Sequence, residues 1–573
     1  MHLLPRLLLA LGLLVGLAAP GSAAAPEKPA PRLPIGMNLT GISDYEPGFP
    51  FKNLMWGARP WHTKNLDDSG PYNTELAGKL PLDSDGYPLE LPYTPEGAEQ
   101  PQYVFTLIPN TTPAGRHVLL YDGEGEIVGS HATRVVSSAP GRVVLELKNA
   151  GLGQYEGIAI RRSKRGDHVR NIRILALADE KADLAANPFR PEFVDYCRQW
   201  HVLRFMDWAA TNNSLEGEWS ERKPPTFYTM IGEGGDTIGR WSPVSTPYQR
   251  LFSGGVAIEH MIHLANLTKT DPWFCMPHRA TPEYMSEFAK LVKAKLDPSL
   301  TIYVEYSNEV WNWQFQQAQW MLLSRVAAEP LAGGEHTGWK DGVPPAEFPI
   351  DNGQLARDGG ADHPERTAVL ARRAFSAWEN VFTGPDRARI VRVVGVQGSW
   401  PDTARRLVEW VMAHGGADAM SPTGYFGPND EIYAKWEAAG ASLTADQVVA
   451  DMRELVINDT VKYRELAGIA REHKLRYVVY EGGQHIQPKD QKETPYLPAL
   501  KAAQFHPGLA EVYMLNFAFQ KTLGVDLFCA FASVSRQGTR WGSWGHQEYY
   551  GQPRSEIPKY GALLDANAPR PAR

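Results

Sequence analysis

The sequence predicts an α/β protein built as a (β/α)8 TIM barrel with an inserted β-rich, sandwich-like module. From residue 187 onward, apolar strand-like runs alternate with helical segments, which is typical of βα units around a parallel sheet. Between about residues 103 and 177, short alternating runs follow one another with no helical period between them, which favours a small antiparallel module. The 573 residues, 43% apolar and 10% aromatic, suffice for both parts.

Eight apolar runs are interpreted as the barrel strands. One residue identifies each run: Ile35, Val202, Trp273, Ile302, Ile390, Ala419, Tyr477 and Leu527. A barrel of this kind places its functional residues at the C-terminal ends of the strands. The alternative is an open doubly wound sheet, but no G-x-G-x-x-G fingerprint follows an early strand and no Walker-type loop is found.

These runs predict a division of the chain into four parts. Residues 1–25 form a signal peptide, residues 33–45 hold the first barrel strand, residues 50–180 form a loop and the β-rich insert, and residues 185–565 complete the barrel. For the insert, a carbohydrate-binding role and a purely structural role both remain open.

The N-terminus has the features of an export signal. His2 and Arg6 precede an apolar run over residues 7–18, and small residues suited to cleavage follow at 21–25. The apolar run is too short for a comfortable membrane span. We therefore expect a secreted or periplasmic protein with no membrane association after removal of the signal.

Charge and cysteine content exclude several classes of partner. The net charge of −7 is mild for this length, so nucleic acid is not expected to bind. Cys197, Cys275 and Cys529 each lie in an apolar context, and no C-x-x-C or Cys/His spacing suggests zinc. We expect no disulfide framework, no metal and no cofactor; the oligomeric state stays open.

The stretch TIYVEYSNEVWNW, residues 301–313, carries the strongest functional signal. It begins as a buried strand and ends in polar groups among aromatic residues. A regular strand would place Glu305 and Glu309 on one side. A carboxyl at Glu309 beside the amide of Asn308 suits protonation of a sugar leaving group. The alternative is an ordinary strand end with a helix-capping asparagine.

A second carboxylate, Glu481, ends the seventh predicted strand in the run RYVVYEGGQ. Two carboxyls at the rim of one barrel can face each other across a substrate. Their separation decides the chemistry, because about 5 Å favours a covalent retaining route and about 6.5–9.5 Å favours inversion through an activated water. The sequence does not supply this distance.

An Asn-Glu pair closing strand four and a Glu closing strand seven resembles the retaining glycoside hydrolases of clan A, which include family 5 cellulases, mannanases and β-glycosidases. The resemblance covers residues 33–42 and about 187–563. It implies that Glu309 is the general acid/base, that Glu481 is the nucleophile and that Asn308 binds the sugar 2-hydroxyl.

The same resemblance implies further substrate-binding residues. Arg204 would support the charge of the nucleophile, although a salt bridge to Asp207 or another local acid is an equal alternative. His278 would lie in the sugar subsite, although it could also be a plain buried histidine. Tyr425 would hydrogen-bond the nucleophile; Thr423 stands where the clan often has a histidine, so this match is partial.

Tryptophans complete the predicted site. After strand eight, Trp541 and Trp544 are both candidates for the platform under the reacting sugar. Candidate sugar-stacking residues in strand-end loops are Trp56, Trp61, Trp208, Trp311, Trp313 and Trp400.

Together the residues predict a metal-free glycosidase that cleaves a β-linked oligo- or polysaccharide with retention. The sugar, the linkage and the choice between endo and exo action are left open. The alternative is a non-catalytic glycan-binding protein on a degenerate barrel, which the fold alone would permit. A barrel esterase is disfavoured because no G-x-S-x-G elbow is found.

Overall fold

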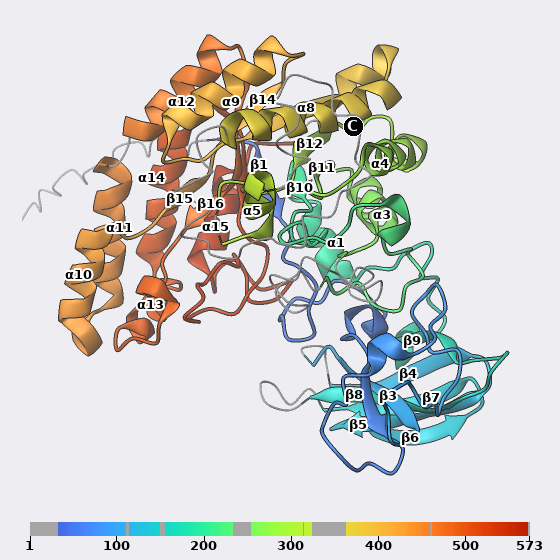
Figure 1. Ribbon diagram of the computed structural model, residues 1–573. Helices are drawn as coiled ribbons and strands as arrows, with labels where there is room; N and C mark the ends of the chain where they lie inside the picture. Colours follow the sequence, from blue (N-terminus) through green and yellow to red (C-terminus); the bar gives the residue numbers. More distant parts are fainter. Residues whose placement is uncertain are drawn as a thin grey trace, which may run out of the picture. The chain divides into compact units, whose positions relative to one another are not determined.

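A closed barrel of parallel strands forms the larger part of the protein, as the sequence predicts (Figure 1). The computed structural model describes residues 32–110, 114–148, 155–232, 254–312, 314–323, 363–458 and 461–570. The strand order is β14-β13-β12-β11-β10-β1-β17-β16, and pairing of β14 with β16 closes the ring. The barrel strands are β1 (Ile35–Asn38), β10 (Val202–Arg204), β11 (Asp271–Met276), β12 (Ile302–Tyr306), β13 (Ile390–Gly395), β14 (Ala419–Ser421), β16 (Arg476–Gln484) and β17 (Val525–Ala530). The short β15 (Gly424–Phe426) follows β14 and also pairs with β16.

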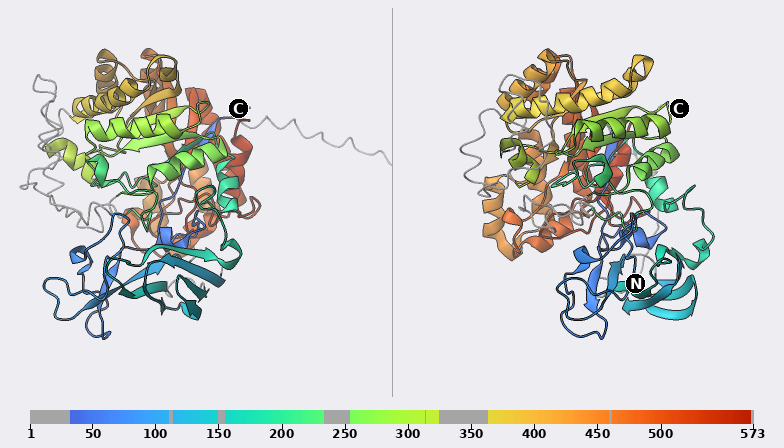
Figure 2. Two further views of the ribbon diagram at one scale, coloured as in Figure 1. Left: turned by 90° about the vertical axis from the view of Figure 1, so that its right-hand side faces the viewer. Right: turned by 45° about the vertical axis from the view of Figure 1, so that its right-hand side comes forward.

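Helices connect these strands and lie outside them in both views of Figure 2. The described α-helices are α1 (Pro191–Cys197), α3 (Ile258–Thr268), α4 (Pro282–Lys295), α5 (Gln316–Leu323), α8 (His363–Val381), α9 (Pro401–Ala413), α10 (Asp430–Ala439), α11 (Ala445–Asn458), α12 (Val461–Glu472), α13 (Leu497–Ala503), α14 (Pro507–Leu523) and α15 (Pro558–Ala566). Their ends follow local sequence signals. Thr281 caps α4 by accepting from the Tyr284 amide, with Pro282 at the first position, and Gly524 ends α14 with φ 83°.

The strands are mostly apolar because both of their faces are buried, and their few charged residues include Arg204 of β10, Glu305 of β12 and Glu481 of β16. In β11, the side chains of Trp273 and Cys275 point into the cluster inside the barrel, whereas Phe274 and Met276 join the larger core between strands and helices. This period of two fixes which residues can reach the mouth of the barrel. The last residues of each strand and those just after it therefore form the functional end.

The inserted module consists of two four-stranded antiparallel sheets, in the orders β2-β3-β8-β5 and β6-β7-β4-β9. Its strands are β2 (His62–Asn65), β3 (Gln102–Ile108), β4 (Gly115–Asp122), β5 (Gly125–His131), β6 (Arg134–Ala139), β7 (Arg142–Leu147), β8 (Glu156–Ser163) and β9 (Arg170–Ala176). The sequence analysis expected short strands over about residues 103–177, and all of these strands except β2 lie in that range, although no separate run marked β6. Those two carry mostly polar or exposed side chains, so they lack the apolar alternation of the others.

The predicted signal peptide, residues 1–25, lies outside the described residues. In the part of the chain that is described, no helix has both the length and the apolar character needed to cross a membrane. The three cysteines are buried, in agreement with their apolar sequence context.

Candidate active site

A cavity of about 910 Å³ opens at the C-terminal end of the barrel strands. It is lined by Met206, Asp207, Asn212, Asn308, Glu309, Trp311, Asn312, Gln314, Phe315, Gln397, Gly398, Ser399, Thr423, Tyr425, Tyr463, Tyr480, Glu481, His485, Gln487, Gln491, Phe531 and Trp544. Three of these residues are acids and seven carry carboxamides. Among the residues that the structure describes, no group of three or more His, Cys, Asp or Glu side chains is arranged to hold a metal ion.

Glu309 reaches this cavity through a change of backbone direction. Strand β12 ends at Tyr306, and both Ser307 (φ 57°) and Glu309 (φ 41°) adopt left-handed conformations. The regular alternation considered for Glu305 and Glu309 therefore does not extend to residue 309. Left-handed conformations are costly for residues other than glycine, and they concentrate at functional sites. The turn leaves Glu305 inside the barrel and directs Glu309 to the cavity.

Glu481 reaches the cavity through an irregularity in β16. The register between β16 and β17 shifts between Val479 and Gly482, as in a β-bulge. In a regular strand, Tyr480 and Glu481 would point to opposite faces. Here both line the cavity, and the Tyr480 hydroxyl donates a hydrogen bond of 2.7 Å to Glu309. The bulge thus allows two successive residues to serve one site.

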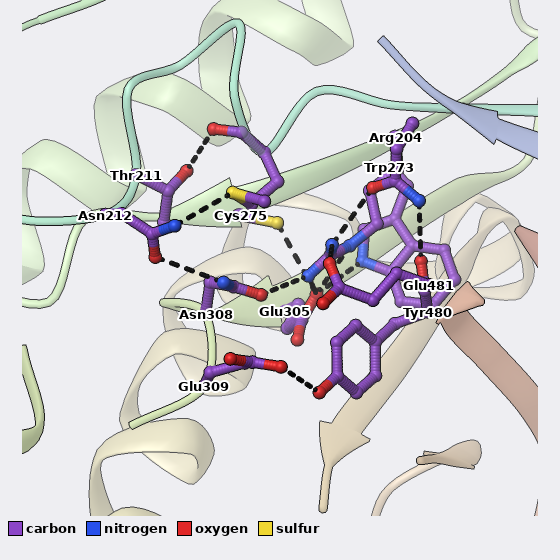
Figure 3. Close-up of polar contacts among 12 residues, drawn as sticks. Arg204, Thr211, Asn212, Trp273, Cys275, Glu305, Asn308, Glu309, Tyr480 and Glu481 are labelled. Atoms are coloured by element: carbon purple, nitrogen blue, oxygen red, sulfur yellow. Dashed lines mark hydrogen bonds and ion pairs between the residues drawn. The ribbon is translucent and has the colours of Figure 1, made fainter. Parts of the chain in front are cut away.

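Arg204, the last residue of β10, is fully buried at the centre of the site (Figure 3). Its Nη2 atom donates to Glu305 at 2.8 Å and to Asn308 at 2.8 Å. Its Nη1 atom lies 3.5 Å from Glu481 Oε2 and donates to Asn38 at 3.1 Å. The sequence left open a salt bridge to Asp207, but the ion pairs of Arg204 are with Glu305 and Glu481.

Glu305 is the buried acid that holds this arginine in place. Its Oε2 atom also accepts hydrogen bonds from Trp273 Nε1 at 2.9 Å and from Cys275 Sγ at 3.4 Å. A carboxylate with an arginine and two further donors has its charge well compensated. Glu305 does not line the cavity, so its role is to orient Arg204 toward Glu481 and Asn308.

Burial raises the pKa of Glu481 well above its ordinary value. The charge of Glu309 raises this pKa further, and Arg204 opposes the rise. Glu309 also lies within hydrogen-bonding reach of Glu481. The Tyr425 hydroxyl is within the same reach of Glu481, and burial followed by the Glu481 charge raises the pKa of Tyr425. The two glutamates therefore behave as a coupled pair that retains a proton.

Asn308 is held by hydrogen bonds to Arg204 on one side and to Asn212 and Gln317 on the other. Its Oδ1 accepts from Arg204, and its Nδ2 donates at 3.1 Å to Asn212 Oδ1. Gln317 Nε2 donates to the same Asn212 oxygen at 2.7 Å and to the Asn308 carbonyl at 2.9 Å. Asn308 is only 2% exposed yet lines the cavity, so its amide is fixed before any ligand enters.

Some of the remaining predicted site residues line the cavity in the structure, and others lie outside it. Trp311 and Trp544 line the cavity, and the ring of Trp544 packs edge-on against Tyr425 at 5.8 Å. Trp541 does not line it and is 55% exposed. His278 is buried outside the lining, with its ring 5.6 Å from Trp320, and burial lowers its pKa.

Of the two tryptophans proposed after strand eight, only Trp544 therefore borders the cavity. His278 matches the alternative of a buried histidine. Trp313 lies outside the described residues.

Three other tryptophans considered for sugar stacking, Trp56, Trp61 and Trp208, are buried in the core rather than in the cavity lining. Trp400 is 55% exposed and lines a second hollow of about 330 Å³, which shares Trp311 and Gln397 with the cavity.

The loop that carries Trp544 is anchored by a buried lysine. Lys559 Nζ donates at 2.7 Å to the Ser543 carbonyl and to Gln537 Oε1, and at 2.9 Å to Gln504 Oε1. Gln484, the last residue of β16, donates to the same Ser543 carbonyl at 2.7 Å. These bonds fix the residue before Trp544 and connect its loop to the strand that carries Glu481.

Several lining residues were not identified from the sequence. Phe531 follows β17 directly, Tyr480 precedes Glu481, and Asn212 and Asp207 follow β10. The sequence analysis gave Asp207 only a local pairing role. Their positions in the sequence could have identified these residues, because residues just after a barrel strand lie at the functional end.

No protein-family model matches this sequence, and no curated protein matches it. Similar folds occur among solved structures at low identity. The GH51 arabinofuranosidase from Xanthomonas axonopodis pv. citri shares 14% identity over 66% of each chain, with a TM-score of 0.35. A GH10 structure from Paenibacillus barcinonensis shares 13% identity over 67% of this chain and 92% of its own, with a TM-score of 0.29.

The endo-1,4-beta-D-mannanase from Thermotoga petrophila shares 11% identity over 65% of this chain and 94% of its own, with a TM-score of 0.26. The chain thus spans slightly less than two thirds of the arabinofuranosidase. These neighbours are glycoside hydrolases. At such TM-scores and identities the likeness carries no argument about the reaction of this chain.

Proposed function

We propose that the protein is a retaining glycoside hydrolase that cleaves a β-linked glycan, with Glu481 as nucleophile and Glu309 as general acid/base. The observation that carries the proposal is the coupled pair of carboxyls in the cavity at the C-terminal end of the barrel. An inverting enzyme needs about 6.5–9.5 Å between its carboxyls to admit the attacking water. Two carboxyls within hydrogen-bonding reach leave no such space, which favours the covalent route.

The surroundings of each carboxyl support its proposed role. Arg204 and Tyr425 face Glu481, so a cation and a hydroxyl donor can stabilise the ionised nucleophile. Glu309 accepts from Tyr480 and from Asn312 Nδ2 at 2.9 Å, which orients its carboxyl in the cavity.

In the first step, Glu481 forms an ester bond to the anomeric carbon while Glu309 gives its proton to the departing oxygen. In the second step, water attacks that carbon, Glu309 takes the water's proton, and Glu481 leaves.

The test is the configuration of the first-formed product. Purified protein is incubated with β-linked glycans and aryl β-glycosides, and the anomeric proton of the released sugar is followed by NMR before mutarotation. The proposal expects the β anomer first. Initial release of the α anomer contradicts retention. Binding without release of sugar from any substrate, by both the wild type and Glu481→Gln, favours the glycan-binding alternative.

Glu309→Gln is expected to lower kcat/KM about 10²–10⁴-fold for substrates with poor leaving groups. For substrates with a dinitrophenyl leaving group, kcat/KM should fall far less, because that group departs without a proton. The parameter to measure is kcat/KM, since it reports the first step alone. An equal loss of kcat/KM for both kinds of leaving group would contradict the role of Glu309 as the general acid. Glu437→Gln, an exposed change on α10, is the matched control.

The pH profile should show the coupling of the two glutamates. The active form has Glu481 ionised and one proton held on Glu309. Because burial and the charge of Glu309 raise the pKa of Glu481 above 4.5, the pair keeps its last proton as the pH rises. Loss of that proton inactivates the enzyme, so the alkaline limb of kcat/KM should lie well above pH 4.5. In Glu309→Gln this limb should disappear for activated substrates; an unchanged limb would assign it to another group.

A further inference from the structure

Asp207 is a carboxylate of the cavity whose hydrogen-bonding capacity is unused. It lies three residues after the end of β10 and lines the cavity. Within the part of the chain that the structure describes, its side chain makes no hydrogen bond and no ion pair. Glu305, Glu309 and Glu481 all have such partners. Asp207 is half-buried, and a carboxylate that lines a cavity without a protein partner is available to a ligand.

Asp207 is close to the reacting centre. Asp207 and Glu481 line the same cavity, and the negative charge of Asp207 contributes to the raised pKa of Glu481. Burial raises the pKa of Asp207 itself to about 6, and the charge of Arg204 opposes this rise. Asp207 is therefore mostly ionised at neutral pH, when its two oxygens act only as acceptors.

The other side chains of the cavity define which ligand suits this carboxylate. The described lining contains three acids and no lysine or arginine. Seven carboxamides supply both donors and acceptors, which match hydroxyl groups. The one nearby arginine, Arg204, is fully buried and already bonded to Glu305, Asn308 and Asn38. A sugar carboxylate would meet only like charge at this site.

We propose that Asp207 is a substrate-binding residue that accepts hydrogen bonds from two neighbouring hydroxyl groups of an uncharged sugar, and that the cavity rejects uronic acid glycans. This inference rests on the proposed function and adds its substrate class. Two hydroxyls on adjacent carbons can each donate to one carboxylate oxygen, and hydrogen bonds to a charged acceptor are the stronger kind. An anionic sugar in the same place would keep its ring hydroxyls but bring a carboxylate into a cavity that already holds three acids, and it would be repelled.

The first test measures binding in the Glu481→Gln background, which is not expected to turn substrate over. The probes are neutral β-linked hexasaccharides of glucose, mannose, xylose and galactose, and the acidic analogues of two of them, β-1,4-glucuronan and β-1,4-mannuronan hexasaccharides. Calorimetry should show binding of a neutral member and at least about 100-fold weaker binding of its acidic analogue. Adding Asp207→Ala should weaken the neutral binding about 10- to 100-fold.

Asp207→Asn keeps the shape of the side chain and removes its charge. It should therefore narrow the gap between the neutral and acidic analogues as well as weaken neutral binding. Asp402→Asn, an exposed change in the first turn of α9, should alter neither affinity. Thermal unfolding of each variant shows whether the fold persists. Unchanged neutral affinity in both Asp207 variants overturns the inference, and so does equal binding of the acidic analogue or no binding of any neutral hexasaccharide.

Turnover by the wild type separates this inference from the proposed function. If the wild type hydrolyses a neutral glycan with retention while the Asp207 variants keep its KM and kcat/KM, only the inference about Asp207 fails. If the wild type hydrolyses nothing that Glu481→Gln binds, and binding still depends on Asp207, the hydrolase proposal fails and the recognition role stands.

Discussion

Glu481→Gln should abolish hydrolysis for every leaving group, with a loss of at least about 10⁴-fold in kcat/KM, equivalent to about 5.5 kcal/mol. The amide cannot form the glycosyl ester, so both steps of the reaction are lost. The fold should persist, because Arg204 keeps its bonds to Glu305, Asn308 and Asn38. Thermal unfolding and kcat/KM on an aryl β-glycoside measure the two effects separately.

Rescue by azide tests the assignment of the nucleophile through the configuration of the product. In Glu481→Gly, an azide ion can occupy the space of the missing carboxylate and attack the anomeric carbon from the same side. The carbon–oxygen bond breaks, a carbon–nitrogen bond forms, and Glu309 protonates the leaving group. The single displacement should give an α-glycosyl azide from a β-glycoside. A β-glycosyl azide, or near-wild-type hydrolysis by Glu481→Gln, would place the nucleophile elsewhere. Glu437→Gln again serves as the control, since its side chain is exposed on α10.

The barrel could be predicted from the sequence because parallel strands buried on both faces leave continuous apolar runs. All eight runs are strands of the closed ring. The positions of Glu309 and Glu481 just after or within such runs placed both near the functional end. For these two residues, knowing the nearest strand was sufficient to predict that they lie near the cavity.

The directions of the side chains could not be predicted in the same way. Glu309 depends on two left-handed residues after β12, and Glu481 on a register shift in β16. A sequence pattern of period two does not reveal either departure, because both interrupt the regular strand. The choice between Trp541 and Trp544 likewise depends on the anchoring of their loop by Lys559.

The ion-pair partner of the buried Arg204 could not be predicted from the sequence either. Arg204 and Asp207 are close in the chain, which made a local salt bridge an equal alternative. The arginine instead turns into the barrel, where Glu305 lies 2.8 Å away, and its cation faces the rings of Tyr480 at 4.9 Å and Trp273 at 5.4 Å. This orientation leaves Asp207 free to face the cavity. One long-range pairing thus determines both the support of the nucleophile and the open carboxylate.

Arg204→Met should therefore lower both stability and activity. Glu305 is 2% exposed, and without the arginine it remains as a buried charge with only Trp273 and Cys275 as donors. Removing one partner of a buried ion pair costs about 3–5 kcal/mol of unfolding free energy. Glu481 also loses its nearest cation, so its pKa should rise further and kcat/KM should fall. Denaturant unfolding and kcat/KM against pH measure the two losses.

The double variant Arg204→Met/Glu305→Leu tests whether these losses are separable. Replacing both ions by apolar side chains removes the unpaired charge, and such replacements are often neutral or stabilising. The double variant should regain most of the stability lost in Arg204→Met. Its activity should stay low, because the cation beside Glu481 and the donor to Asn308 are still absent. Recovery of activity together with stability would show that Arg204 acts only through folding, and Arg204→Lys, which keeps the charge but not the forked geometry, should give an intermediate rate.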